Sequence, residues 1–282
     1  MKKLLLAILL LASTQIFAQQ NMNVATYNLR YANKGDSTAG NGWGSRYPVI
    51  AQLIRFNDLD VFGTQEVLHH QLLNLTDSLP GYKWIGIGRD DGKTKGEYSA
   101  IFYQSDKYTV VKSGTFWMSG TDTEHPNKGW DAQLPRICTW AQLKDKKTGF
   151  TFNFFNLHMD HVGIEARRES SKLVVSKIKE MVGTIPTILT GDFNIDQHNE
   201  SYAVVNDSGL LKDCFVLSPV KLANSPTFNS FKVEGAKGDA RIDHIFVSKQ
   251  FKVNRYGILT HSFGGRVPSD HYPVVVNLSV GK

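Results

Sequence analysis

The sequence of 282 residues is poor in cysteine and has no long apolar run beyond its first residues. Its two cysteines, Cys138 and Cys214, are too few for a disulfide-rich scaffold, and they lack the cysteine and histidine spacing of a zinc site. A bond between them and two buried free thiols both fit the sequence. No later segment is long and apolar enough to cross a membrane, so we expect no stable membrane insertion.

Internal repeats, low-complexity tracts and linkers rich in proline and serine are also absent, so we expect one domain over residues 19–282. The formal net charge of +6 is compatible with anionic substrates. The basic residues do not form the continuous run expected of a groove that tracks several phosphates of a nucleic acid. Nothing in the sequence indicates an obligate protein partner.

The N-terminal segment has the features of a secretory signal. Lys2 and Lys3 form a basic start, an apolar run follows over residues 4–11, and small and polar residues lead to Ala18. This order predicts a signal peptide over residues 1–18 that is removed after Ala18. We therefore expect an exported protein that is periplasmic or extracellular.

The spacing of apolar residues predicts helices interspersed with many strands. The clearest helix covers residues 165–182, and two others are expected at 45–57 and 68–79. Strands are predicted at 23–29, 60–64, 82–88, 97–103, 108–118, 136–144, 151–158, 187–190, 241–247 and 274–278. This order predicts an α/β fold in which helices cover mixed sheets.

Polar residues that bind metals or transfer protons stand at the ends of several predicted strands. A single aspartate in such a place is usually a turn or cap residue. Strand ends in α/β folds are nevertheless where active sites form, and here many ends carry such groups together. The candidates are Asn28, Glu66, His158, Asp192 with Asn194, Asp243 with His244, and Asp270 with His271.

These residue types suit the metal-assisted hydrolysis of a phosphate ester. Oxygen ligands hold Mg²⁺ with positions left for water and substrate, and Glu66, Asp270 and Asn28 are oxygen donors. The attacking water needs a carboxylate or imidazole to accept its proton. The developing negative charge needs hydrogen-bond donors, for which the available groups are Asn194, His158, Arg136 and His271.

Six motifs in the chain resemble, in their order and spacing, those of the endonuclease/exonuclease/phosphatase superfamily, the group with the deoxyribonuclease I fold. They are TYNLR at 26–30, TQE at 64–66, NLHMDH at 156–161, GDFN at 191–194, RIDHIF at 241–246 and SDHYPV at 269–274. The resemblance covers nearly the whole chain after residue 25. It implies an α+β fold, a four-layer α/β/β/α sandwich with two central mixed β-sheets.

The resemblance also implies a role for each polar strand end. Asn28 and Glu66 would bind an essential Mg²⁺ or Mn²⁺, with Asp270 as a further ligand. Asp192 would orient or deprotonate the attacking water. Asn194 would hold a phosphate oxygen.

The histidines receive roles from the same resemblance. Asp243 would fix the tautomer of His271 and favour its charged form. The pair would then stabilise the pentacovalent transition state or act as the base. His158 would lie on the phosphate or leaving-group side.

Three further charged residues have a structural as well as a functional interpretation. Glu97 is either the carboxylate partner of His158 or an exposed residue at the start of a strand. Arg136 is either a phosphate-contacting arginine or a surface arginine at a strand start. For Arg46 we expect a local cap or ion pair.

The superfamily includes nucleases, sugar and inositol phosphatases, sphingomyelinases and deadenylases, and its shared motifs do not separate them. Loops are expected at 90–95, 119–134 and 230–239, and their mixed charges favour a small phosphorylated substrate such as a sugar phosphate or a short diester. The alternative is an exported nuclease acting on DNA or RNA. An inactive binding protein of the same fold is less favoured, because the residues for metal binding and catalysis are all present.

Overall fold

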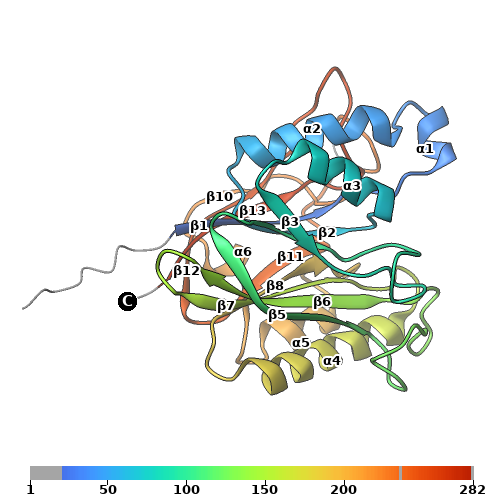
Figure 1. The fold of residues 1–282 in the computed structure, drawn as a ribbon. Coiled ribbons are helices and arrows are strands. Elements are labelled where there is room, and N and C mark those ends of the chain that lie inside the picture. Colours follow the sequence, from blue (N-terminus) through green and yellow to red (C-terminus); the bar gives the residue numbers. More distant parts are fainter. Residues whose placement is uncertain (1–20, 235–236, 281–282) are drawn as a thin grey trace, which may run out of the picture.

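The computed structural model describes residues 21–234 and 237–280, so the predicted signal peptide at 1–18 lies outside the described residues. Two β-sheets stack face to face, and helices cover the outer face of each (Figure 1). This arrangement confirms the four-layer sandwich implied by the resemblance. Within the described ranges, no helix has both the length and the apolar character of a membrane span.

The first sheet has seven strands, and the second has six. The order in the first is β10 (Lys221–Leu222), β12 (Phe251–Ile258), β13 (Val274–Val280), β1 (Asn21–Asn28), β2 (Val61–Gln65), β4 (Ile101–Gln104) and β3 (Tyr82–Ile85). The order in the second is β5 (Tyr108–Trp117), β6 (Ile137–Asp145), β7 (Thr151–His158), β8 (Thr187–Asp192), β11 (Asp243–Val247) and β9 (Lys212–Asp213).

Three apolar clusters correspond to the three interfaces of a four-layer sandwich. One fills the space between the sheets, one joins the first sheet to α2 (Trp43–Phe56) and α3 (His69–Ser78), and one joins the second sheet to α4 (Ile164–Val182) and α5 (Glu200–Asn206). Two short helices, α1 (Lys34–Thr38) and α6 (Cys214–Leu217), are the remaining helical elements of the described residues. Burial of these apolar faces is the main favourable term in folding.

A network of buried polar side chains lies between the two sheets, near the polar strand ends. Asn156 on β7 donates to the carbonyls of Thr64 and Ala100, and its Oδ1 accepts from Gln65 at 2.6 Å and Thr190 at 3.1 Å. Gly63 leaves room for this network, because a Cβ there would lie 2.2 Å from Asn156 Oδ1. Position 63 must therefore be glycine for the two sheets to pack this closely.

The observed elements differ from the predicted ones mainly at strand ends and in short segments. The expected strand at 97–103 begins only at Ile101, so Glu97 lies in the segment before it. Strand β12 was not predicted, because its apolar alternation changes phase between Val253 and Tyr256, where a bulge shifts the register with β13. Both cysteines are buried free thiols, so the alternative of a disulfide is wrong.

The strand directions bring the polar ends together at one edge of the two sheets. β1 runs parallel to β2 and β7 runs parallel to β8, so each pair ends on the same side. In register, His158 faces Asp192 across one pair, and Asp192 faces Asp243 at the start of antiparallel β11. The chain then returns through residues 269–273 into β13, which pairs with β1. The candidate residues thus share one location because of sheet register.

Candidate active site

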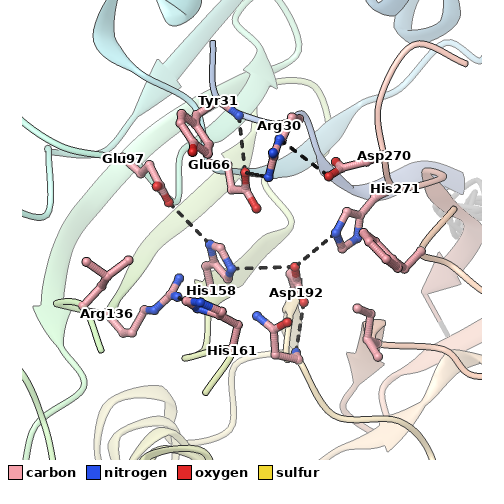
Figure 2. A pocket seen from close by; sticks show the side chains of 14 residues that line it. Arg30, Tyr31, Glu66, Glu97, Arg136, His158, His161, Asp192, Asp270 and His271 are labelled. Carbon is pink, nitrogen blue, oxygen red and sulfur yellow. Dashed lines mark hydrogen bonds and ion pairs between the residues drawn. The ribbon is translucent and has the colours of Figure 1, made fainter. Parts of the chain in front are cut away.

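The polar strand ends line a cavity of about 550 Å³ (Figure 2). Asn28 and Asp243 are buried beside it and bond to Asp192 and His271. The predicted residues in its wall are Glu66, Glu97, Arg136, His158, Asp192, Asn194, Asp270 and His271. The structure therefore brings these predicted residues to one place. The candidate His244 is not among them, because its ring is buried with Nε2 3.0 Å from the carbonyl oxygen of Ile195 and Nδ1 3.5 Å from Asp213 Oδ2.

Asp192 is at the centre of this arrangement. Its Oδ2 accepts a hydrogen bond from Asn28 Nδ2 at 2.9 Å and lies 3.7 Å from Nε2 of both His158 and His271. Burial and the nearby carboxylate of Asp243 raise the pKa of Asp192 to about 7. A carboxylate with such a pKa is well suited to accept a proton near neutral pH.

Asn194 completes a tight turn directly after Asp192. Its backbone has a left-handed conformation, with φ of 51°, and its N–H donates to Asp192 Oδ1 at 2.9 Å. Its side-chain Nδ2 donates to the carbonyl of Met159 at 3.0 Å. Asparagine tolerates this backbone conformation better than most residues. The turn thereby fixes the orientation of both the Asp192 carboxylate and the Asn194 amide.

Asp243 and His271 form a buried pair beside Asp192. The carboxylate Oδ2 of Asp243 lies 2.9 Å from His271 Nδ1. Burial alone would lower the pKa of His271, but the carboxylates of Asp243 and Asp192 outweigh it and raise the pKa to about 10. The imidazole is therefore cationic at neutral pH, which suits charge stabilisation better than proton acceptance.

His158 is on the opposite side of Asp192 and has the opposite charge preference. Burial lowers the pKa of His158 well below its usual value, and the charges of Arg136 and Arg89 lower it further. Its Nδ1 lies 3.8 Å from Glu97, too far for a hydrogen bond. Glu97 instead forms a two-pronged ion pair with Arg89, at 2.7 and 2.9 Å. The structure thus gives Glu97 a closer partner than His158.

The residues predicted to hold a metal form one wall of the cavity. Asn28 Nδ2 donates to Glu66 Oε1 at 3.0 Å, so these two predicted ligands are in direct contact. The carboxylates of Glu66 and Asp270 both face the guanidinium of Arg30, at 3.9 and 3.6 Å. These distances exceed hydrogen-bond length, so both acids keep oxygen lone pairs for another cation. The donor set of carboxylate and amide oxygens fits a hard divalent ion.

A second group of possible ligand atoms comprises Asp192, Asp243 and His271, which lie within 4.8 Å of one another. In this group, His271 Nδ1 already bonds to Asp243, and the imidazole carries a positive charge. A charged imidazole is not a metal ligand, because coordination needs the neutral ring. The wall of Glu66 and Asp270 is therefore the better place for an ion.

Arg136 is buried rather than on the surface. Its Nε donates to Asp160 Oδ2 at 3.1 Å, and its Nη2 lies 2.9 Å from His161 Nδ1. Its Nη1 is buried and has no partner among the residues that the structure describes. Arg136 also belongs to the cavity wall. An unpaired guanidinium nitrogen at such a site is suited to bind an anion.

Arg46 makes the expected local contact, from Nε to the carbonyl of Asn41 at 2.8 Å, and also bonds to distant parts of the chain. It is buried, and Nη1 donates to the carbonyls of Leu29 at 2.6 Å and Pro268 at 3.0 Å, while Nη2 donates to that of Arg30 at 2.9 Å. The bond to Pro268 joins residues that are 222 positions apart. Arg46 thus ties the loop after β1 to the loop that carries Asp270.

Sequence reasoning assigned no chemical role to five polar or aromatic residues in or beside the wall. Arg30, Tyr31, His161 and Phe228 line the cavity, and Arg89 supports it through Glu97. The only available signal was proximity to motifs, since Arg30 ends TYNLR and His161 ends NLHMDH. Phe228 had no such signal, because its isolated bridge to His271 depends on the tertiary path of the chain.

Comparison with known proteins identifies the group to which this arrangement corresponds. A sequence model of the Endonuclease/Exonuclease/phosphatase family matches residues 25–271. A solved structure of a protein of that family from Bacteroides thetaiotaomicron is 51% identical, with a TM-score of 0.91, and the match covers 94% of this chain and 100% of that chain.

Two other solved structures are informative. A mannosyl-6-phosphatase from Bacteroides thetaiotaomicron is 52% identical, with a TM-score of 0.89 and coverage of 91% of this chain and 99% of that chain. The catalytic domain of human nocturnin is 18% identical, with a TM-score of 0.66 and coverage of 94% and 98%. At that identity the second likeness concerns the fold alone.

Proposed function

The chain belongs to the endonuclease/exonuclease/phosphatase family, whose members hydrolyse phosphate esters, and from this premise we propose that it is a metal-dependent phosphomonoesterase acting on a sugar phosphate. The observation that carries the proposal is its similarity, over nearly the whole length of both chains, to a mannosyl-6-phosphatase. A hexose phosphorylated on its primary hydroxyl is the favoured substrate. The cavity of about 550 Å³ is within the usual range for a small-molecule site.

We assign the metal to the wall formed by Asn28, Glu66 and Asp270. Their hard oxygen donors favour Mg²⁺, with Mn²⁺ as an alternative. A bound divalent ion supplies charge neutralisation at the phosphoryl oxygens. For Asn28 to take part, its amide must turn so that Oδ1 rather than Nδ2 faces Glu66. Arg30 remains beside the two carboxylates and balances part of their charge.

The remaining residues act on the water and on the phosphoryl group. Asp192 orients the water and accepts its proton, since its Oδ2 is the central acceptor of the cavity. His271, held by Asp243, places a positive charge near the transition state. Asn194, His158 and Arg136 supply the other polar contacts to the phosphoryl group and the leaving group.

A substrate panel tests the proposal. Mannose 6-phosphate, other hexose phosphates, bis-p-nitrophenyl phosphate, plasmid DNA and total RNA are compared with Mg²⁺ and with EDTA. We expect hydrolysis of sugar monoesters that EDTA abolishes. Cleavage of DNA or RNA without sugar phosphatase activity would replace the proposal by the nuclease alternative, and activity that survives EDTA would refute the metal requirement.

Asp192→Ala tests the proposed role of the central carboxylate. We expect a loss of about a hundredfold or more in kcat, the usual contribution of a positioned acid–base group. Asp77→Ala, on the exposed face of α3, is the matched control and should retain activity. A loss of less than about tenfold for Asp192→Ala would contradict its role.

We also propose that residues 1–18 direct export of one catalytic domain over residues 19–282. The support is the order of basic, apolar and small residues in the N-terminal segment. Expression of the full chain in a bacterium, followed by mass measurement of the secreted or periplasmic product, should give a chain that begins at residue 19. A full-length product confined to the cytoplasm would contradict export.

A further inference from the structure

Arg30 ends the motif TYNLR and lines the cavity, but the resemblance assigned it no role. Its guanidinium lies between the carboxylates of Glu66 and Asp270 (Figure 2). Its Nε donates to Asp36 Oδ2 at 2.8 Å, and Nη2 lies 3.5 Å from Asp36 Oδ1. The other terminal nitrogen, Nη1, makes no hydrogen bond within the described ranges, and its carboxylate neighbour Glu66 is 3.9 Å away. One hydrogen-bonding edge of this fixed cation is therefore available.

The anchor of Arg30 is itself held firmly. Asp36 accepts from Asn33 Nδ2 at 2.6 Å, and Asn33 in turn caps the start of α1 by accepting from Asp36 N–H. The backbone carbonyl of Arg30 accepts from Arg46 at 2.9 Å and from Gln71 at 3.1 Å. A side chain held at both ends loses little conformational entropy on binding a ligand, which favours a recognition role.

The backbone of Arg30 also has a feature of functional residues. Its φ is 55°, in the left-handed region, and Glu66 and Asn194 in the same cavity have φ of 64° and 51°. Such conformations cost on the order of 1–3 kcal/mol and concentrate where surrounding structure imposes them for function. Arg30 shares this feature with two residues that the family motifs place in the active site.

The other arginines around the cavity have their partners away from the wall assigned to the metal, although Nη1 of Arg136 is also unpaired among the described residues. Arg89 forms a two-pronged ion pair with Glu97. Arg136 contacts Asp160 and His161 on the far side of His158. Arg30 alone among these three adjoins the wall assigned to the metal. A phosphoryl group bound at that wall would meet the free edge of Arg30.

We propose that Arg30 is a specificity-determining residue that contacts a phosphoryl oxygen through Nη1 and favours the dianion of a monoester over the monoanion of a diester. This inference rests on the proposed phosphoesterase function and names the feature that selects its substrate class. A monoester presents an additional anionic oxygen, with a second pKa near 6. A fixed guanidinium therefore interacts more strongly with a monoester than with a diester.

Kinetics of Arg30→Gln on two ester classes test the proposal. The monoesters are mannose 6-phosphate and p-nitrophenyl phosphate, and the diester is bis-p-nitrophenyl phosphate. We expect kcat/KM to fall roughly 10- to 100-fold on the monoesters, the effect of one hydrogen bond to a charged group, and less than about threefold on the diester. Arg55→Gln, at an exposed position of α2, is the matched control and should change neither.

Binding measurements separate this role from an effect on the metal. Calorimetry with Mn²⁺ alone should show unchanged or tighter binding to Arg30→Gln, because a competing cation has been removed. Inorganic phosphate should bind the Mn²⁺-loaded variant about tenfold or more weakly than the wild type. Equal losses on both ester classes, weaker Mn²⁺ binding that accounts for the loss, or unchanged phosphate affinity would each overturn the inference.

The outcomes also distinguish this inference from the proposed function. A wild-type protein without monoester activity refutes the proposed function, whereas an active wild type with an unaffected Arg30→Gln refutes only the role of Arg30. If Arg30→Gln does not fold, the variant Asp36→Asn tests the inference in its place. It keeps the arginine but weakens the hydrogen bonds that hold its guanidinium. Asp36→Asn should lower the preference for monoesters over the diester about threefold or more, and an unchanged preference would overturn the inference.

Discussion

Asp160 is expected to be one of the most important single acids for stability. It is buried, and its Oδ1 accepts from the N–H groups of Val162 at 3.0 Å and Gly163 at 2.8 Å. Its Oδ2 accepts from Gln133 N–H at 3.1 Å and from Arg136 Nε at 3.1 Å. The carboxylate therefore joins the loop before β6 to the start of α4 and orients an arginine of the cavity.

The magnitude follows from the pKa of Asp160. Burial alone would raise it, but the hydrogen bonds from Gly163 and Val162 and the charge of Arg136 lower it from 3.8 to about 2. That difference corresponds to about 2 kcal/mol of stability from the charged form at pH 7. Asp160→Asn also leaves Arg136 buried without its counter-ion, and removal of one partner of a buried pair costs roughly 3–5 kcal/mol. We expect Asp160→Asn to lower the free energy of unfolding by about 3–5 kcal/mol at pH 7, and this figure includes the contribution of the charge.

Urea unfolding of wild type, Asp160→Asn and the exposed control Asp77→Asn measures this loss at pH 7 and pH 3. Because the folded pKa is depressed, the charge contribution is complete above the unfolded pKa of 3.8 and is lost as pH falls through about 2. At pH 3, between these two pKa values, the charge contribution of Asp160 should be about half its value at pH 7. The other carboxylates are the same in both proteins and cancel in the difference. A difference below about 1 kcal/mol at pH 7, or one that does not shrink at pH 3, would refute the reasoning.

Three other perturbations test the structure. Gly63→Ala should lower stability by about 2 kcal/mol or more in urea unfolding, because its Cβ would displace the Asn156 network, and a neutral result would contradict that packing. Arg46→Met should lower the melting temperature by roughly 5–15 °C, because several buried carbonyls lose a charged donor, and Arg46→Lys should recover only part of it. Asp243→Asn should lower kcat about a hundredfold or more, because His271 loses its orienting carboxylate, and retained kcat would show that the pair is only structural. It should also lower stability, because the buried charge of His271 loses its counter-ion.

Much of the site is predictable from local sequence because strand ends are marked locally. GDFN, for example, combines a short apolar strand with the residues of a tight turn, and the turn in the structure holds Asp192 and Asn194 as that pattern indicates. Helix α4 at Ile164–Val182 agrees with the predicted 165–182 because its apolar positions recur at helical spacing. The pairing of Asp243 with His271, which the resemblance to the family implies, is present in the structure at 2.9 Å between Oδ2 and Nδ1.

Partner choice among charged residues could not be predicted in the same way. Glu97 faces both His158 and Arg89, and the loop path after β3 makes Arg89 its closer partner. From the sequence, Arg136 could lie on the surface or in the site. Its burial depends on the carboxylate of Asp160, which only the fold brings beside it. Such pairs depend on distances set by loops, for which the sequence has no periodic signal.

The sequence by itself determined which chemical groups stand at the strand ends, and hence the family and the bond that is broken. Only the tertiary structure decided how these groups are supported. Arg46 ties two loops together through a carbonyl 222 positions away from it, and Arg30 comes to lie between Glu66 and Asp270. The physical reason is that hydrophobic periodicity specifies elements and their faces, whereas sheet register and loop conformation fix the angstrom-scale distances between side chains.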